Sequence, residues 1–343
     1  MGKVTMQDIA DSLNISRVTV WKVFNNQKGV SQSLREQVLT RAQEMGYAFD
    51  LTTSATNDSV TKNIALVVSR PDSSTFWTSI IHSMAKELSF NNVNLLYTYV
   101  PSEYTPGYTL PNTLNASNID GCVIINIYDA RIYRMLNSLA MPKVFLDITP
   151  DFDSNELSGD LFLIEGFRSE YEITKSLVKK GYKNIGFLGD IEYARTNLDR
   201  YKGFMQCIED NGLEVSDKYI HIGKIGINSY YEELAAYLDS LSTLPDAFVC
   251  VSDYIIHFLL NYFNAHQDRL KKPLILTGFD GSDEYEGIDN RFSTAFVDTN
   301  MLGKRLAMQL LYRLSHDRAP LETIYIKPRL IYRKSILQPF QAL

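Results

Sequence analysis

The chain has 343 residues and a net charge of −6, and 45% of its residues are hydrophobic and 22% charged. This length is too great for one small core and predicts two or three compact units in a globular protein. No apolar run reaches the ~18 residues of a membrane span. The first residues lack the apolar core of a signal peptide, so we expect a cytoplasmic protein with no membrane partner.

The charge distribution limits where a nucleic acid could bind, and the cysteine spacing indicates the state of the thiols. Residues 1–50 hold six Lys or Arg against five Asp or Glu, which leaves about −7 for the remainder. A nucleic acid would therefore have to be bound locally, by the N-terminal segment. The three cysteines, Cys122, Cys207 and Cys250, lie far apart and form no CxxC pair, which predicts reduced and mostly buried thiols.

The first 46 residues predict three short helices. Apolar residues recur at helical spacing in residues 6–13, 17–24 and 34–45, and Gly46 ends the third helix. A residue with a capping side chain precedes each helix: Thr5, Ser16 and Ser31. Only a short turn separates the first two helices, which predicts a compact helix-turn-helix unit.

The second of these helices has two contrasting faces. At 3.6 residues per turn, one side is an ordinary apolar stripe made of Val20, Val23 and Phe24. The other side places a tryptophan and a valine beside two cations. That face consists of Arg17, Val18, Trp21, Lys22 and Asn25.

This second face suits the major groove of DNA, where the second helix of a helix-turn-helix meets the base edges. Arg17 is able to bond guanine bidentately, and Val18 to contact a thymine methyl group. Lys22 suits guanine or phosphate, and Asn25 the backbone. For Trp21, two roles are open: a phosphate contact or packing on a neighbour. The predicted DNA-binding residues are Thr5, Ser16, Arg17, Val18, Trp21, Lys22, Asn25 and Ser31.

Residues 48–62 are rich in Thr, Ser and Asn and predict a linker. Beyond them, strands alternate with helices, which is typical of doubly wound parallel sheets. The predicted strands are 63–69, 93–100, 121–127, 143–148, 161–165, 184–189, 219–223, 246–252, 274–280 and 294–300. The predicted helices are 76–92, 171–181, 200–212, 230–241, 254–263 and 301–314. About 280 residues of this pattern favour two similar lobes over one.

Side chains at the ends of these strands predict a ligand cleft, because ligands of such sheets bind beyond the carboxyl ends of the strands. Carboxylates and an arginine bind hydroxyl groups, and aromatic faces stack on the C–H face of a sugar ring. The predicted effector-binding residues are Phe76, Trp77, Glu165, Arg200, Ser252, Asp253 and Asp280. For Glu165 and Ser252, a loop or helix-capping role is an equal alternative.

Enzyme motifs are absent from the sequence. It contains no GxSxG, HExxH, P-loop or GxGxxG pattern, and its five histidines are scattered. We therefore expect no enzyme, no cofactor and no metal site.

The stretch VTMQDIADSLNISRVTVWKVFNNQKGVSQSLREQVLTRAQEMGY resembles, over some 44 residues without a gap, the DNA-binding domain of the LacI/GalR family of bacterial repressors. The resemblance implies a homodimer that reads a pseudo-palindromic operator, with Arg17 and Val18 as the main base readers. Trp21 and Lys22 stand where the family usually has Ser followed by Arg. Lysine keeps the charge of arginine but loses its planar fork.

The rest of the chain resembles this family more loosely, in NIALVVSRPDSSTFW, GYKNIGFLGD, NLDRYKGF, LILTGFDG and IKPRLIYRKS. The implied fold is an N-terminal helix-turn-helix domain of three helices and an α/β periplasmic-binding-protein-like core of two doubly wound lobes with a small-ligand cleft between them. The expected boundaries are 1–47 for the DNA-binding domain, 48–62 for the linker, 63–160 with 292–320 for the first lobe, and 161–291 with 321–343 for the second.

The linker departs from the family pattern. Relatives usually have Pro-Asn and, further on, a leucine that enters the minor groove. Here Phe49-Asp50 replaces Pro-Asn, and Thr56 stands at the place of the leucine. Two alternatives stay open: Leu51 takes over this insertion, or the linker does not insert.

These observations predict a transcriptional repressor of a carbohydrate-utilisation operon. Its expected partners are double-stranded operator DNA, a second copy of the chain and a small effector, with a sugar or sugar derivative favoured. A nucleobase co-repressor or a partner protein as the input, and a pure sugar-binding module, are the alternatives.

Overall fold

The computed structural model describes residues 4–24, 29–45, 47, 62–69, 74–115, 117–226, 229–282 and 291–339. The chain divides between Thr61 and Lys62 into two compact units, and each is described by itself. Within the described ranges, no helix combines the length and the apolar character needed to cross a membrane.

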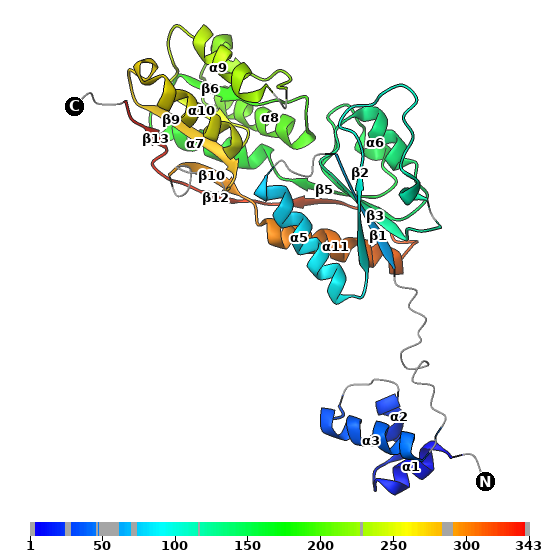
Figure 1. Ribbon diagram of the computed structural model, residues 1–343. Helices are drawn as coiled ribbons and strands as arrows, with labels where there is room; N and C mark the ends of the chain where they lie inside the picture. The colour runs from blue at the N-terminus through cyan, green and yellow to red at the C-terminus, as the bar shows by residue number, and fades with distance from the viewer. Residues whose placement is uncertain are drawn as a thin grey trace. The chain divides into compact units, whose positions relative to one another are not determined.

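The described part of the N-terminal unit contains three helices (Figure 1): α1 (Met6–Ser12), α2 (Arg17–Phe24) and α3 (Gln32–Glu44). All three expected caps are confirmed. The Asp8 N–H donates to the Thr5 hydroxyl over 3.4 Å, the Thr19 N–H to the Ser16 hydroxyl over 3.0 Å, and the Leu34 N–H to the Ser31 hydroxyl over 3.3 Å. These bonds occupy helix N–H groups that would otherwise lack a partner, which explains why the helices begin where they do.

A small apolar core joins these helices. Its buried members are Ile9, Ala10, Val20, Val23, Phe24, Val38 and Ala42. Phe24 stacks on Tyr47 with 5.6 Å between ring centroids, and the Arg35 guanidinium donates to the carbonyl oxygen of Val23 over 3.1 Å. The stripe predicted for the inner side of α2 is therefore confirmed.

The first lobe of the second unit contains a parallel six-stranded sheet in the order β11-β5-β4-β3-β1-β2 (Figure 1). Its strands are β1 (Asn63–Val68), β2 (Asn94–Tyr99), β3 (Gly121–Ile125), β4 (Lys143–Leu146), β5 (Asp160–Ile164) and β11 (Thr323–Ile326). Helices α5 (Thr75–Phe90) and α11 (Thr299–Ser315) share one apolar core with the sheet, and α6 (Ala130–Asn137) packs in a second core.

The second lobe contains a sheet in the order β12-β10-β9-β8-β6-β7, with β13 paired to β9. Its strands are β6 (Ile185–Leu188), β7 (Ile220–His221), β8 (Ala247–Cys250), β9 (Leu274–Asp280), β10 (Ser293–Phe296), β12 (Arg329–Ile331) and β13 (Ile336–Leu337). Its helices are α7 (Phe167–Lys179), α8 (Arg195–Asp210), α9 (Tyr230–Ser240) and α10 (Asp253–Ala265). Short 3₁₀ turns lie at Asn112–Leu114, Ser154–Glu156, Asp217–Tyr219 and Gln267–Arg269.

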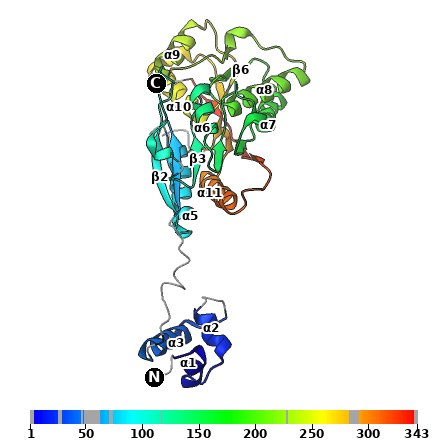
Figure 2. The ribbon, with the colours of Figure 1, turned by 90° about the vertical axis from the view of Figure 1, so that its right-hand side faces the viewer.

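Helices α8 and α10 cover opposite faces of this second sheet, and Figure 2 shows α7 and α8 next to one another. Neighbouring residues of a strand point to opposite faces. A side chain at Gly278 would collide with Asp253 of α10, whereas the ring of the next residue, Phe279, lies against Arg200 of α8. The doubly wound architecture expected from the alternating pattern is thus confirmed in both lobes.

Three strands correct the expected lobe boundaries. Strand β5 belongs to the first sheet rather than the second lobe, β10 to the second sheet, and β11 to the first. The physical reason is pairing: β5 is hydrogen-bonded between β4 and β11, and β10 between β9 and β12. The chain therefore crosses between the lobes three times, after β5, after β10 and after β11.

Two helices begin four or more residues earlier than the apolar pattern predicts, and one was not predicted. Helix α7 begins at Phe167 and α8 at Arg195, four and five residues before the expected starts. Helix α6 was missed, although Asp129 caps it by accepting from the N–H groups of Arg131 and Ile132. The three cysteines are buried and free, as expected, and burial raises the pKa of the Cys207 thiol to about 11.

Candidate functional site

A cavity of about 380 Å³ lies between the two sheets, and both lobes line it. Leu146 ends β4, Ile164 ends β5 and Asp280 ends β9, so the cavity lies at the carboxyl ends of strands, where doubly wound sheets bind ligands. The first lobe contributes Ser74, Phe76, Trp77, Tyr128, Leu146, Asp147 and Ile164. The second contributes Asp190, Tyr193, Ala194, Thr196, Asn197, Arg200, Ile225, Tyr230, Val251, Ser252, Tyr254, Asp280 and Ser282.

Aromatic side chains form much of this lining. Phe76 and Trp77, in the first turn of α5, meet edge to face with 5.3 Å between centroids. Tyr128 of the first lobe and Tyr193 of the second lie 4.1 Å apart, ring to ring, across the cleft. Two further tyrosines of the second lobe, Tyr230 and Tyr254, complete the lining. Flat apolar faces of this kind stack on planar or ring-shaped ligands.

Arg200 is the central cation of the cavity. Its side chain is almost fully buried, and its Cζ lies 3.6 Å from the ring centroid of Phe279. One Nη donates to the carbonyl oxygen of Val251 over 2.5 Å, and the other lies 3.5 Å from Asp280 Oδ1. The long distance to Asp280 leaves that carboxylate able to accept a hydrogen bond from a ligand.

Asp280 and Ser252 lie in the lining, as predicted. Asp280 has a φ of +94°, which turns the chain sharply at the end of β9. Burial raises its pKa, and the Arg200 guanidinium opposes that shift. The Ser252 hydroxyl precedes α10 without capping it, so it is available to the cavity. Together they supply an acceptor and a hydroxyl beside Arg200.

Asp147 connects the lobes and was not predicted. Its carboxylate accepts from the N–H of Ile148 over 2.8 Å, from the N–H of Thr196 over 3.3 Å, and from the Thr196 hydroxyl. The Arg195 N–H also donates to the carbonyl oxygen of Ile148 over 2.8 Å. Burial raises the pKa of Asp147 to about 6, against the opposing effect of these hydrogen bonds.

Asp190 and Tyr193 form a second connection at the same cleft. Asp190 accepts from the N–H groups of Glu192, Tyr193 and Ile225 and thereby fixes the loop that follows β6. The Tyr193 hydroxyl donates to Asn126 Oδ1 of the first lobe over 2.6 Å. Asp147 directly follows β4 and Asp190 lies two residues after the end of β6, so the strand-end rule that selected Asp280 would also have found them.

Two predicted effector-binding residues lie outside the lining, which corrects their expected role. The Glu165 carboxylate accepts from the N–H groups of Arg168 and Ser169 over 2.6 and 3.0 Å and so caps α7. Asp253 accepts from the Ser282 N–H over 2.8 Å and from the Thr294 hydroxyl over 3.1 Å. Both carboxylates are engaged in holding the backbone of the second lobe.

The predicted DNA-binding face of α2 is exposed. Val18 is 60% and Trp21 47% exposed, although large apolar side chains are usually buried. Arg17 and Ser16 are exposed too, and Lys22 is half-buried. The DNA contacts themselves stay predictions. Asn25 and the linker residues Phe49, Asp50, Leu51 and Thr56 lie outside the described residues.

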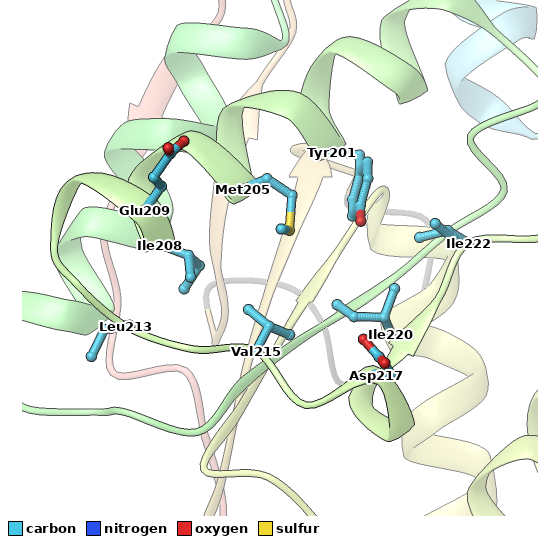
Figure 3. A pocket seen from close by; sticks show the side chains of 9 residues that line it. All are labelled: Tyr201, Met205, Ile208, Glu209, Leu213, Val215, Asp217, Ile220 and Ile222. Carbon is cyan, nitrogen blue, oxygen red and sulfur yellow. The ribbon is translucent and has the colours of Figure 1, made fainter.

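A second hollow, of about 520 Å³, lies in the second lobe between α8 and β7 (Figure 3). Its lining residues are Tyr201, Met205, Ile208, Glu209, Leu213, Val215, Asp217, Ile220 and Ile222. All of them come from one lobe, and none is a predicted site residue. Of these two cavities, the one between the lobes brings predicted residues together, so it is the candidate effector site.

Family models match both units. The model for bacterial regulatory proteins of the lacI family matches residues 5–49, and the model for a periplasmic binding protein-like domain matches residues 174–336. Curated relatives span the whole chain. HTH-type transcriptional repressor PurR of Mannheimia succiniciproducens is 24% identical and covers 97% of this chain and 98% of its own length. HTH-type transcriptional regulator RegA of Clostridium saccharobutylicum is 23% identical, with coverage of 97% and 99%.

Solved structures share the fold. The Lac repressor dimer bound to operator and the anti-inducer ONPF has a TM-score of 0.65 at 17% identity, over 97% of this chain and 99% of that one. The complex of transcriptional regulator CelR with cellobiose has a TM-score of 0.64 at 18% identity, over 97% and 100%. This chain therefore contains a helix-turn-helix domain of the lacI family of bacterial regulatory proteins, followed by a periplasmic binding protein-like domain.

Proposed function

We propose that the chain is a repressor whose N-terminal unit binds operator DNA and whose operator affinity changes when a small effector occupies the cleft between the lobes. The observation that carries the proposal is the cavity itself. It combines the Arg200–Asp280 pair with aromatic faces from both lobes, so a bound ligand contacts both lobes at once. Coupling of this kind between two sites is typically worth about 1–3 kcal/mol.

A sugar or sugar derivative is the effector that this chemistry favours. The lining contains three carboxylates, Asp147, Asp190 and Asp280, against the single cation Arg200. An excess of acceptors suits a neutral ligand rich in hydroxyl donors and disfavours an anionic one. Relatives with solved structures carry cellobiose or ribose, and a carbohydrate-utilisation operon is the corresponding target.

A nucleobase is the second candidate. Several curated relatives that span the chain are named PurR. The tyrosine pair at 4.1 Å and the neighbouring Phe76 and Trp77 can also stack on a flat neutral base. The two classes of ligand differ in their hydrogen-bond donors, because a base offers fewer donors to the three carboxylates than a sugar does.

Thermal unfolding with a ligand panel separates these candidates. A ligand at 100 times its Kd adds about 2.7 kcal/mol to the free energy of unfolding. We expect cellobiose, ribose or another neutral sugar to raise the Tm, hypoxanthine and guanine to leave it unchanged, and Arg200→Ala to remove the response. A rise in Tm with a purine but not with a sugar would make a nucleobase the effector. No rise in Tm with either class would contradict both candidates.

A gel-shift assay tests binding to operator DNA. Genomic fragments should show specific binding that weakens steeply with salt, because lysines and arginines displace counterions from the phosphates. The same fragments should lose the complex when the effector found above is added, or gain it if that ligand is a co-repressor. Absence of any specific, salt-sensitive complex would favour a pure sugar-binding module.

A further inference from the structure

A carboxyl group without a hydrogen-bond partner lies beside the effector cleft. Glu170 of α7 is fully buried, and neither of its carboxyl oxygens has a hydrogen-bond partner among the described residues. The Nε of Arg200 also has no hydrogen-bond partner among these residues. Buried polar groups are almost always hydrogen-bonded, so two complementary groups that both lack a partner require an explanation.

The packing of α7 on α8 brings these groups together. A Cβ atom on Gly166 would lie 2.9 Å from Arg200 Cγ, so the start of α7 contacts the stem of that arginine. Glu170 lies four residues further on, one turn along the same face, and its N–H donates to the Gly166 carbonyl oxygen. Arg200 directs its two Nη groups to Val251 and Asp280, which leaves Nε as the donor without an acceptor.

The charge around Arg200 is unbalanced. The negative charges of Asp280 of β9, Asp253 of α10 and Glu165 before α7 raise the pKa of Glu170. The Glu170 charge in turn raises the pKa of the buried Cys250 thiol of β8. Several ionised carboxylates around one guanidinium would leave a net negative charge in a buried site, so some of them keep their protons. Burial raises the pKa of Glu170 to about 8 in spite of the attraction of Arg200.

We propose that Glu170 is a positioning residue with two states: as a neutral acid it leaves Arg200 to Val251 and Asp280, and as a carboxylate it takes the Arg200 Nε–H and draws the guanidinium toward α7. The proton lost by Glu170 goes to solvent. If the cleft binds the proposed effector, this movement weakens the effector site as the pH rises. That last step alone rests on the proposed function.

The Arg200 side chain can be observed directly. In the ¹⁵N-labelled full chain, the Arg200 Nε–H resonance is identified by its loss in Arg200→Lys. We expect it to move when the pH is raised from about 6 to about 9, on either side of the Glu170 pKa of about 8. In Glu170→Gln, an uncharged isostere, it should not move.

Glu172→Gln is the matched control. It makes the same chemical change two residues along the same helix, at a side chain paired with Arg168, and it should keep the response of the wild type. An Arg200 Nε–H resonance that stays fixed in the wild type, or that moves equally in Glu170→Gln, would overturn the proposal.

Thermal unfolding against pH provides a second readout that needs no assignment. A carboxyl with a raised pKa stabilises the fold below its unfolded pKa, and this stability is lost as the pH rises through the folded pKa. The Tm of Glu170→Gln minus that of the wild type should therefore increase between about pH 4.5 and about pH 8 and then level off. A permanent Glu170 carboxylate paired with Arg200 would give a Tm difference that is negative, because Gln removes the ion pair, and that does not change over this pH range.

Both measurements are made without effector. A ligand panel that finds no binder contradicts the proposed function and leaves the Arg200 response intact. A fixed Arg200 resonance overturns the role of Glu170 and leaves effector binding intact.

Discussion

Asp147 links the two lobes through one side chain, which extends from the end of β4 to the first residues of α8. Its φ of +65° and its hydrogen bonds to Thr196 place the carboxylate against both the helix and the cavity. The same burial that makes it an inter-lobe contact raises its pKa to about 6. Ionisation of this one residue therefore changes the charge at a contact between the two lobes.

Asp147→Asn should remove part of the pH dependence of stability. The unfolded carboxyl loses its proton near pH 3.8 and the folded one near 6, so the wild type loses stability as the pH rises through this window. The loss is on the order of 2 kcal/mol. Urea unfolding at both ends of the window measures it. Asp151→Asn, at an exposed neighbour, should keep the slope of the wild type, and an unchanged slope in Asp147→Asn would contradict the interpretation.

Trp21→Ser should weaken operator binding or alter half-site preference without unfolding the N-terminal unit. The side chain is 47% exposed on the face opposite to the buried stripe of α2, so it lies outside the apolar core that joins the three helices. Fluorescence anisotropy with operator DNA measures affinity, and circular dichroism checks the helices. Gln37→Ala, an exposed change on α3, is the control. Equal affinity and preference in Trp21→Ser would show that Trp21 takes no part.

Residues that act within one local segment were readily predicted from the sequence. Arg200 lies in α8 and Asp280 at the end of β9, and both reach the cavity. Contacts between Thr196 and Asp147, or Tyr193 and Asn126, join residues about 50 to 70 positions apart. Local patterns carry no information on such pairs. Glu165 shows a second limit of prediction from sequence. A carboxylate at the end of a strand can reach the ligand cleft or cap the next helix, and Glu165 caps the helix.

At the scale of elements, α11 is tied to β5 by a buried ion pair. Arg313 donates twice to the Asp160 carboxylate and also to the carbonyl oxygens of Ala319 and Pro320. Asp160 is fully buried, and Gln309 donates to it over 2.7 Å. The network fixes the segment that leads into β11, which is why that strand joins the first sheet despite its late position in the chain.

Arg313→Met should destabilise the chain by roughly 3–5 kcal/mol, because it leaves the Asp160 carboxylate buried without its cation. The double variant Asp160→Asn with Arg313→Met should lose less than the sum of the single variants. Urea unfolding of the three variants measures the coupling. Additive losses would mean that the two residues act independently.

We propose that two copies of the chain associate through the edge strand β2. Leu96 is 39%, Tyr97 50% and Tyr99 57% exposed, and Phe90 at the end of the neighbouring α5 is 74% exposed. Exposed apolar side chains along a sheet edge favour association.

Tyr99→Lys should shift the protein toward monomer in sedimentation at micromolar concentration, since it places a charge in that interface. The matched control is Tyr325→Lys, at the 61%-exposed residue of β11 on the opposite edge of the same sheet. A control that dissociates equally, or a Tyr99→Lys variant that stays dimeric, would place the interface elsewhere.

At the scale of the whole molecule, the lobes depend on each other through three chain crossings and the contacts at the cleft. The N-terminal unit is covalently joined to the first lobe alone, because β1 begins at Asn63 directly after the linker. Along the chain, the path from the second lobe to the N-terminal helices therefore runs through the first lobe. The lobes were predictable from the alternating pattern, but the crossings depend on strand pairing and were not.

The chain contains only two tryptophans, and one falls in each unit: Trp21 on α2 and Trp77 in the lining of the cleft. Each binding event therefore has its own intrinsic fluorophore. Trp21→Phe leaves an emission that reports on the cleft, and Trp77→Phe leaves one that reports on DNA. In the wild type, titrating each ligand in the presence of the other would give the coupling free energy twice, without a dye, and the two values must agree because both describe the same protein.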